Sequence, residues 1–266
     1  MPRFAANLSL LFQEHDFPAC IAAAARAGFG AVECQFPYAW PAAQLADALH
    51  AANVAMVLHN LPAGDWAAGE RGIACHPDRV GEFRDGVGRA IDTACQLGCP
   101  QLNCLAGVVP AGGDPERALS TLVDNLRFAA DALQAAGLRL LIEPINTFDI
   151  PGFFVSRSDQ ALAIIDAVGA DNLFLQFDLY HAQRMEGELA GTLSRHLPRI
   201  GHIQIADTPG RHEPGTGEIN FPFLFDHLDA LGYAGWIGCE YLPVGDTEAG
   251  LGWMRGGNMP PHTPPN

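Results

Sequence analysis

Short apolar runs alternate along the chain with longer stretches in which apolar residues recur every three or four positions. The short runs have the length of buried β-strands, whereas the recurrence in the longer stretches is typical of helices with one apolar face. We predict eight strands, over Phe4–Leu8, Ala31–Phe36, Ala55–His59, Gln101–Leu105, Arg139–Glu143, Leu173–Asp178, Ile200–Ala206 and Trp236–Glu240. The predicted helices cover Phe17–Ala27, Ala42–Ala52, Pro77–Leu97, Pro115–Ala136, Asp159–Val168, Met185–Leu197 and Phe221–Leu231.

Local signals at the helix ends support these boundaries. Asp114 and Ser158 are candidate N-caps, because a short polar side chain can accept a hydrogen bond from a free backbone N–H at a helix start. Glycine, which readily adopts the left-handed conformation that ends many helices, follows predicted helices at Gly28, Gly98, Gly137, Gly169 and Gly232. The repeated order of strand, helix and glycine is typical of a parallel sheet with crossover helices.

Eight such units predict an α/β fold, the single-domain (β/α)8 TIM barrel. An open doubly wound sheet would alternate in the same way, but no GxGxxG motif follows the first predicted strand. The chain length of 266 residues also matches the roughly 250 residues of one barrel. We expect the barrel to span residues 1–256 and the Gly- and Pro-rich residues 257–266 to form a flexible tail.

The charged residues exclude several classes of function. The formal net charge is −15 and no basic stripe is visible, which disfavours nucleic acid as a partner, because binding a phosphate backbone needs clustered cations. All 15 residues counted as lysine or arginine are arginine. Mechanisms that need a lysine Schiff base or a P-loop lysine are therefore excluded.

The N-terminal segment and the cysteines indicate where the protein resides. The only apolar stretch near the N-terminus is short and ends at Gln13 and Glu14, so we predict neither a signal peptide nor a membrane-spanning helix. The 7 cysteines are scattered without a CxxC pair, as expected of free thiols in a reducing compartment. We expect a cytoplasmic protein without a membrane partner, and a homo-oligomer stays open because one sequence reveals no interface.

In TIM barrels the active site lies at the carboxyl ends of the strands, and four predicted strands carry a candidate metal ligand there. Glu143, Asp178 and Glu240 end the fifth, sixth and eighth strands, and Gln204 lies in the seventh. Each of them alone could be a capped strand end or the partner of a nearby arginine. Together they form a set of hard oxygen ligands that suits one divalent cation, Mg2+ or Mn2+.

Other polar residues near these strand ends are candidates for binding a small-molecule substrate. His181 could donate a hydrogen bond to a substrate hydroxyl, or it could be a structural histidine. Arg211 and Glu213 lie in the long loop after the seventh strand, and an arginine there suits bidentate recognition of a carboxylate. His59 and Asn103 are weaker candidates, better suited to supporting the site or anchoring a loop.

The segment from His59 to Gly72 combines glycines with the aromatic residue Trp66. Such a composition after a barrel strand predicts a loop that covers the pocket as a lid. Trp66 could equally be a packing residue.

Four segments of the chain resemble the hydroxypyruvate isomerase family within the xylose isomerase-like barrels. These segments are LIEPIN, QFDLYH, HIQIADTPGRHEPGTGEI and GCEY, and the resemblance extends over nearly the whole chain, to about Gly250. The loop sequence PGRHEPGTGEI is the most diagnostic part, since a barrel pattern alone hosts many functions. The family includes hydroxypyruvate isomerases and the closely similar 2-oxo-tetronate isomerases, which these motifs do not separate.

The resemblance implies a metal-dependent sugar-acid isomerase. It implies that Glu143, Asp178, Gln204 and Glu240 bind one divalent cation, and that Glu143 and Glu240 exchange protons with the substrate. The implied reaction interconverts hydroxypyruvate and tartronate semialdehyde (2-hydroxy-3-oxopropanoate), or the analogous four-carbon 2-oxo-tetronate, through an enediolate. Sugar epimerases of the wider superfamily commonly have a histidine where Gln204 stands, so this residue favours the isomerase branch.

Three other functions stay open at this point. A sugar 3-epimerase would use the same metal and the same two glutamates but would move a proton at a single carbon. An endonuclease of the AP-repair type would share the barrel but would need a histidine-rich zinc cluster and a basic groove, which the sequence lacks. A non-catalytic sugar-acid-binding barrel would have no use for both glutamates.

Overall fold

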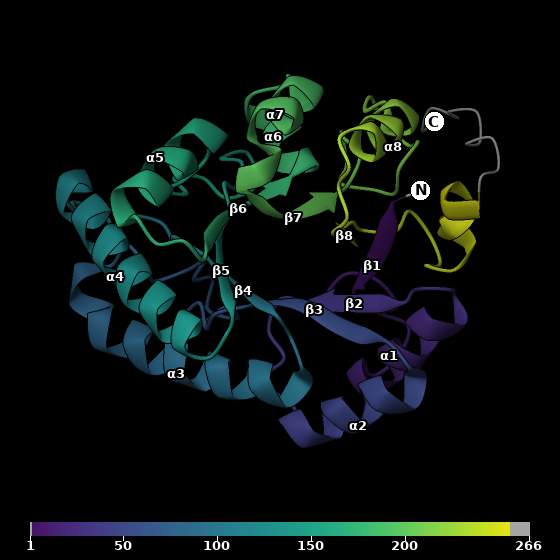
Figure 1. Ribbon diagram of the computed structural model, residues 1–266, viewed down its shortest axis with the longest axis horizontal. Helices are drawn as coiled ribbons and strands as arrows, with labels where there is room; N and C mark the ends of the chain where they lie inside the picture. The colour runs from purple at the N-terminus through teal and green to yellow at the C-terminus, as the bar shows by residue number, and fades with distance from the viewer. Residues whose placement is uncertain (1, 256–266) are drawn as a thin grey trace.

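The computed structural model describes residues 2–255 and contains a closed barrel of eight parallel strands surrounded by helices (Figure 1). The strands are β1 (Arg3–Asn7), β2 (Ala31–Cys34), β3 (Ala55–Asn60), β4 (Gln101–Cys104), β5 (Arg139–Ile142), β6 (Leu173–Asp178), β7 (Ile200–Ile205) and β8 (Trp236–Cys239). Each strand pairs with its neighbours in the sequence, and β1 pairs with β8 to close the ring. The predicted single-domain TIM barrel is confirmed.

Helices follow the strands and cover the outside of the barrel (Figure 1). They are α1 (Phe17–Arg26), α2 (Ala42–Ala52), α3 (Val80–Leu97), α4 (Pro115–Ala135), α5 (Ser158–Val168), α6 (Leu179–Met185), α7 (Leu189–His196) and α8 (Phe221–Ala230), with 3-10 turns at Pro77–Arg79, Leu197–Arg199 and Ala249–Arg255. The carboxylate of Asp114 accepts a hydrogen bond from the backbone N–H of Glu116, so the predicted cap of α4 is confirmed. The five glycines predicted after helices all have positive φ.

Two local predictions are wrong. The helix predicted over Met185–Leu197 begins only at Leu189, as α7, because Gly187 and Glu188 adopt consecutive left-handed conformations, and the separate helix α6 that precedes it was not predicted. Ser158 does not cap α5 but is its first residue, and its hydroxyl donates to the carboxylate of Glu186 at 2.8 Å. The predicted tail, 257–266, lies outside the described residues.

The inside of the barrel holds a buried polar network as well as apolar side chains. Glu33 on β2 accepts hydrogen bonds from Asn7 on β1 and from Gln204 on β7, at 2.9 and 2.8 Å. Its other oxygen lies 2.7 Å from Nε2 of His202. Asn7 also donates to Glu240 at 3.0 Å, so the network continues from the interior to the carboxyl end of β8.

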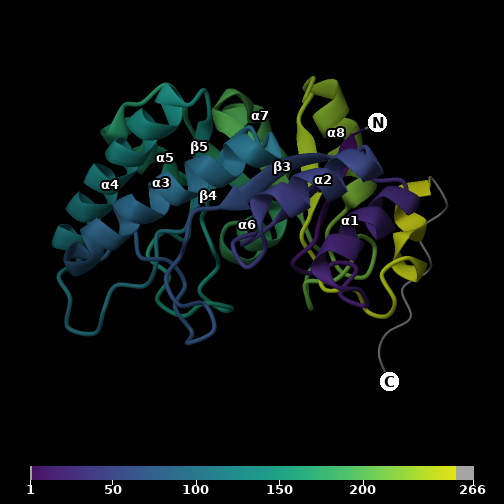
Figure 2. The same ribbon diagram turned by 90° about the horizontal axis from the view of Figure 1, so that it is seen from below.

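The loops that follow β3, β4 and β5 extend together from one end of the barrel, at the lower edge of Figure 2. These long loops mark the end of the barrel where a site is expected.

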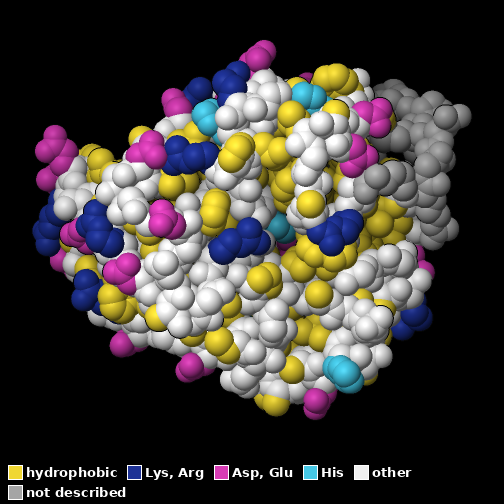
Figure 3. Space-filling model, viewed as in Figure 1, with side chains coloured by type: hydrophobic (Ala, Val, Ile, Leu, Met, Phe, Trp, Pro, Cys, Tyr) yellow, Lys and Arg dark blue, Asp and Glu magenta, His cyan; other side chains and the backbone are white. Residues whose placement is uncertain are grey.

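On the face shown in Figure 3, arginine and acidic side chains are interspersed rather than segregated. Within residues 2–255, no helix combines the length and the apolar character that crossing a bilayer requires.

Candidate active site

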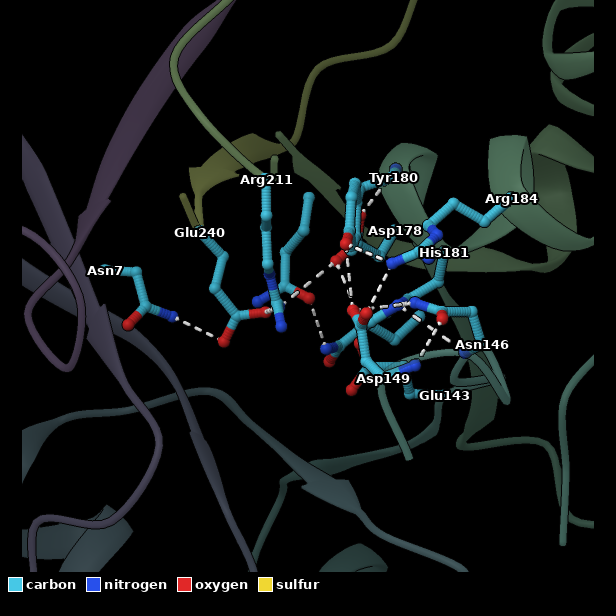
Figure 4. Close-up of polar contacts among 12 residues, drawn as sticks. Asn7, Glu143, Asn146, Asp149, Asp178, Tyr180, His181, Arg184, Arg211 and Glu240 are labelled. Carbon is cyan, nitrogen blue, oxygen red and sulfur yellow. Dashed lines mark hydrogen bonds and ion pairs between the residues drawn. The ribbon is translucent and has the colours of Figure 1, made fainter. Parts of the chain in front are cut away.

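Three carboxylates from the ends of different strands converge at this end of the barrel (Figure 4). Asp178 is the last residue of β6, while Glu143 and Glu240 directly follow β5 and β8. All three are buried, and Glu143 and Glu240 line a cavity of about 220 Å³. The same cavity is lined by His181, and by Arg211 from the loop after β7.

The burial and closeness of the three carboxylates raise their pKa values. Burial raises the pKa of Glu143 well above its usual range, and the nearby Glu240 and Asp178 raise it further. Burial also raises the pKa of Asp178 to about 7, against the lowering effect of Arg211. Burial likewise raises the pKa of Glu240, again opposed by Arg211. Keeping all three groups charged is therefore costly unless further positive charge joins them.

Asp178 occupies the junction between β6 and α6 and has one oxygen free. Its Oδ1 accepts a hydrogen bond of 2.7 Å from the backbone N–H of Tyr180 and so caps α6. Its Oδ2 is buried and has no hydrogen-bond partner in the described structure. Ligand atoms of Glu143, Asp178 and His181 all lie within 4.8 Å of one another. Two carboxylates and a histidine ring around a buried oxygen that accepts no hydrogen bond form a group that could hold a divalent cation.

The hydrogen bonds of Asn146 fix which nitrogen of His181 carries the proton. Asn146 Oδ1 accepts from two backbone N–H groups of the following turn, at 3.1 and 2.9 Å, so its Nδ2 must be the group that faces His181 Nδ1, at 2.7 Å. His181 Nδ1 is then an acceptor. Burial lowers the pKa of His181 well below its usual value, with Arg211 and Arg184 adding to the effect. The neutral ring therefore carries its proton on Nε2.

This tautomer bears on what His181 can do. Its Nε2 lies 3.7 Å from Asp178 Oδ2 and 3.9 Å from Glu143 Oε1. A protonated ring nitrogen donates a hydrogen bond and cannot bind a metal. In this arrangement His181 is suited to donate to a substrate oxygen, whereas the carboxylates offer oxygen atoms that suit a cation.

Arg211 lies between Glu240 on one side and Asp178 on the other (Figure 4). Its Nη2 is 2.8 Å from Glu240 Oε2 and 3.9 Å from Asp178 Oδ2, and its guanidinium lies over the ring of Tyr180. The residue adopts a left-handed conformation, with a φ of 59°, which is uncommon for a residue other than glycine. The guanidinium that the sequence suggests for a substrate carboxylate is thus paired with carboxylates of the protein.

The diagnostic loop after β7 is organised by one buried carboxylate, Asp207. Its two oxygens accept four backbone hydrogen bonds of 2.9 to 3.1 Å, from Thr208, Gly215, Gly217 and Ile219. A Cβ at Gly217 would overlap the backbone of Thr208, which explains a glycine there. These contacts close the loop and hold Arg211 over the cavity.

The other predicted site residues, Gln204, His59 and Glu213, do not line the cavity. Gln204 is the register partner of Asp178, but its Nε2 donates to Glu33 and its Oε1 accepts from Gln176 at 2.6 Å. His59 is fully buried and its Nδ1 lies near Tyr38 and the Asn60 carbonyl, outside the cavity lining. Glu213 accepts a hydrogen bond from the backbone N–H of Val244, also away from the lining.

The sequence predictions missed or underrated several residues at the site. Gln35 and Asn7 both donate to Glu240, at 3.1 and 3.0 Å, and Asn103, predicted only as a supporting residue, donates to Glu143 at 2.8 Å. Arg71 and Trp66 reach the cavity from the loop after β3, in line with the expected lid. Asn7 ends β1 as Asp178 ends β6, so the rule that found the carboxylates could also have found it.

Known proteins match the whole barrel. The family model described as xylose isomerase-like TIM barrel matches residues 21–256. The hydroxypyruvate isomerase of Escherichia coli (strain K12) is 55% identical over 254 residues, which cover 96% of this chain and 98% of that protein. The 2-oxo-tetronate isomerase of Cupriavidus necator is 52% identical over 255 residues, with the same two coverages.

Solved structures agree with this match. A crystal structure described as AP endonuclease, family 2, from Brucella melitensis has a TM-score of 0.94 at 45% identity and covers 96% of this chain and 98% of its own. A structure of L-ribulose 3-epimerase has a TM-score of 0.74 at 22% identity, covers 90% of this chain and 80% of its own, and shares the fold. The resemblance inferred from the sequence is confirmed, and the chain belongs to the xylose isomerase-like TIM barrel family, with relatives named hydroxypyruvate isomerase and 2-oxo-tetronate isomerase.

Proposed function

We propose that this protein interconverts hydroxypyruvate and 2-hydroxy-3-oxopropanoate, or the corresponding four-carbon 2-oxo-tetronate. The observation that carries the proposal is the convergence of Glu143, Asp178 and Glu240 on one end of the barrel, with one oxygen of Asp178 that accepts no hydrogen bond. The relatives named for these two reactions share about half of their residues with this chain over nearly the full length.

The donor set supports a divalent cation, Mg2+ or Mn2+, as the cofactor. Glu143, Asp178 and Glu240 would hold it, with Gln204 as the fourth predicted ligand, since its carbonyl oxygen has a second lone pair beside the bond from Gln176. When bound, such a cation polarises the carbonyl of a 2-oxo acid and stabilises the negative charge of an enediolate.

The residues of the chain supply the proton transfers. We assign the exchange of protons with the two adjacent carbons to Glu143 and Glu240, because both carboxylates line the cavity from different strands. Their hydrogen bonds from Asn103, Asn7 and Gln35 orient the carboxylates toward the cavity. His181 Nε2–H is placed to donate to a substrate oxygen, and each such general acid or base contributes roughly 10²- to 10⁴-fold to the rate.

The Glu240→Gln variant tests these assignments. It should retain the fold and the melting temperature but lose most turnover of hydroxypyruvate in the presence of Mg2+ or Mn2+. Activity and melting temperature are measured on the same samples, and full activity in this variant would remove Glu240 from the mechanism.

A sugar 3-epimerase remains the second candidate, because it would use the same carboxylates. Product identification in D2O separates the two, since epimerisation returns the ketose with deuterium at one carbon whereas isomerisation moves the carbonyl. We also propose that the protein acts in the cytoplasm, because all seven cysteines are free in the structure.

A further inference from the structure

Two arginines line the cavity, and they differ in what they already bind. Arg211 comes from the loop after β7 and Arg71 from the loop after β3. Both could in principle receive the carboxylate of a sugar-acid substrate. Their contacts decide between them.

The charge of Arg211 is already used by the protein. Its guanidinium lies within 4 Å of both Glu240 and Asp178, and Glu143 also acts on it through space. Three carboxylates and one guanidinium leave two formal negative charges, which a divalent cation would balance. An added substrate carboxylate then brings one uncompensated negative charge into a buried site, which is costly without another cation.

The guanidinium of Arg71 is available to supply this additional positive charge. Its Nη1 donates to the backbone carbonyls of Trp66 and Glu70, at 3.2 and 2.8 Å, and its guanidinium lies 4.2 Å from the centre of the Trp66 ring. Within residues 2–255, no carboxylate forms an ion pair with Arg71, and its Nε and Nη2 have no protein partner. The adjacent Glu70 is instead bound by Arg79.

The loop holds Arg71 in a defined position. Trp66 packs against Phe36 with 5.0 Å between ring centroids, which fixes the surface on which Arg71 lies. Gly72 has a φ of 116°, and a Cβ there would come within 2.5 Å of the Leu105 carbonyl oxygen, so the backbone beside Arg71 is in tight contact with the loop after β4. The guanidinium of Arg71 is thus preorganised before substrate binds, and its Nε and Nη2 are without protein partners. This geometry suits a bidentate contact with a carboxylate.

We propose that Arg71 binds the carboxylate of the substrate and so determines the preference of this site for 2-oxo acids over neutral ketoses. The proposal rests on the proposed function, because it concerns the substrate of the same cavity. Arg211 then keeps its place beside Glu240, and Arg71 provides the compensating charge from another part of the cavity lining.

The test compares Arg71→Gln with Arg26→Gln, which makes the same charge change at an exposed position on α1. Steady-state kinetics with hydroxypyruvate should show a KM raised about 10- to 100-fold in Arg71→Gln, with kcat changed far less, because the lost contact is a charged hydrogen-bonded pair. Arg71→Lys should fall between this variant and the unaltered protein.

Two non-reacting probes separate carboxylate recognition from a general effect on the lid. The Kd of the metal-loaded protein for pyruvate should rise by a similar factor in Arg71→Gln, while the Kd for pyruvamide, in which a neutral amide replaces the carboxylate, should not change. Equal weakening of both probes, or unchanged binding of pyruvate, would overturn the proposal. If Arg71→Gln does not fold, unchanged pyruvate binding by Arg71→Lys would do so.

These binding measurements also distinguish the two proposals from each other. If the unaltered protein turns over neither hydroxypyruvate nor the four-carbon 2-oxo-tetronate but Arg71→Gln selectively loses pyruvate, the proposed reaction is wrong and the role of Arg71 stands. If turnover is observed and Arg71→Gln has the KM of the unaltered protein, the reaction stands and the role of Arg71 is wrong.

Discussion

Replacing Asp207 by asparagine should destabilise the loop that carries Arg211. The buried carboxylate accepts four backbone hydrogen bonds, two on each oxygen. Asparagine keeps one carbonyl oxygen and places an NH2 group where the other oxygen stood, so two backbone N–H groups lose their acceptor and face a donor. With about 1.5 to 3 kcal/mol for each bond to a charged acceptor, the loss is about 3 to 6 kcal/mol. The neutral amide is less costly to bury than a carboxylate, so we expect the lower end.

Urea denaturation measures this change in the free energy of unfolding. Asp47→Asn, an exposed change on α2, is the matched control and should lie within about 0.5 kcal/mol of the unaltered protein. Amide hydrogen exchange should also become faster at Gly215, Gly217 and Ile219 in Asp207→Asn, and activity should fall as Arg211 loses its position. A change below about 1 kcal/mol with unaltered exchange at those amides would refute the reasoning.

Three further changes test other parts of the structure. Asn146→Asp should move the proton of His181 to Nδ1, because a carboxylate only accepts, and 15N NMR of the imidazole reports this directly; an unchanged Nε2–H signal would contradict the assignment. Gly72→Ala should destabilise the protein by about 1 to 3 kcal/mol more than Gly69→Ala, since both have positive φ but only the Cβ at position 72 meets backbone atoms; equal melting temperatures would count against the close contact. Glu70→Gln should cost under about 1 kcal/mol at pH 7, because the hydrogen bond from Arg79 lowers the pKa of Glu70 and stabilises the charged side chain. That contribution is present above the ordinary pKa of a glutamate and is lost as the pH falls through the lowered pKa, so the difference between the two proteins should shrink in acid. If the difference in the free energy of unfolding between Glu70→Gln and the unaltered protein grew as the pH was lowered, this explanation would be contradicted.

The sequence was sufficient to predict the barrel and its three acidic strand ends. Parallel strands buried on both faces are read as apolar runs, and a charged residue that closes such a run must lie at the same end of the barrel as the others. Glu143, Asp178 and Glu240 were found by this rule and lie close enough to act on one another electrostatically. The prediction of these three residues agrees with the structure because the position of a residue within a strand depends only on the local sequence.

Contacts between separate loops could not be predicted in the same way. The pairing of Arg211 with Glu240 depends on how Asp207 folds the intervening loop, and the free edge of Arg71 depends on Glu70 being bound by Arg79. The tautomer of His181 is set by a turn after β5 that has no periodic pattern. The break between α6 and α7 was missed because Gly187 and Glu188 lie within an otherwise helical sequence pattern.

The most direct test of the whole account is NMR of hydroxypyruvate incubated in D2O with the protein, first loaded with Mg2+ or Mn2+ and then exhaustively chelated. The account predicts that the loaded protein forms 2-hydroxy-3-oxopropanoate, or acts on the four-carbon 2-oxo-tetronate, with deuterium entering from solvent, and that chelation stops the reaction until metal is restored. Turnover that is unchanged after complete chelation, or none with either substrate, would contradict it.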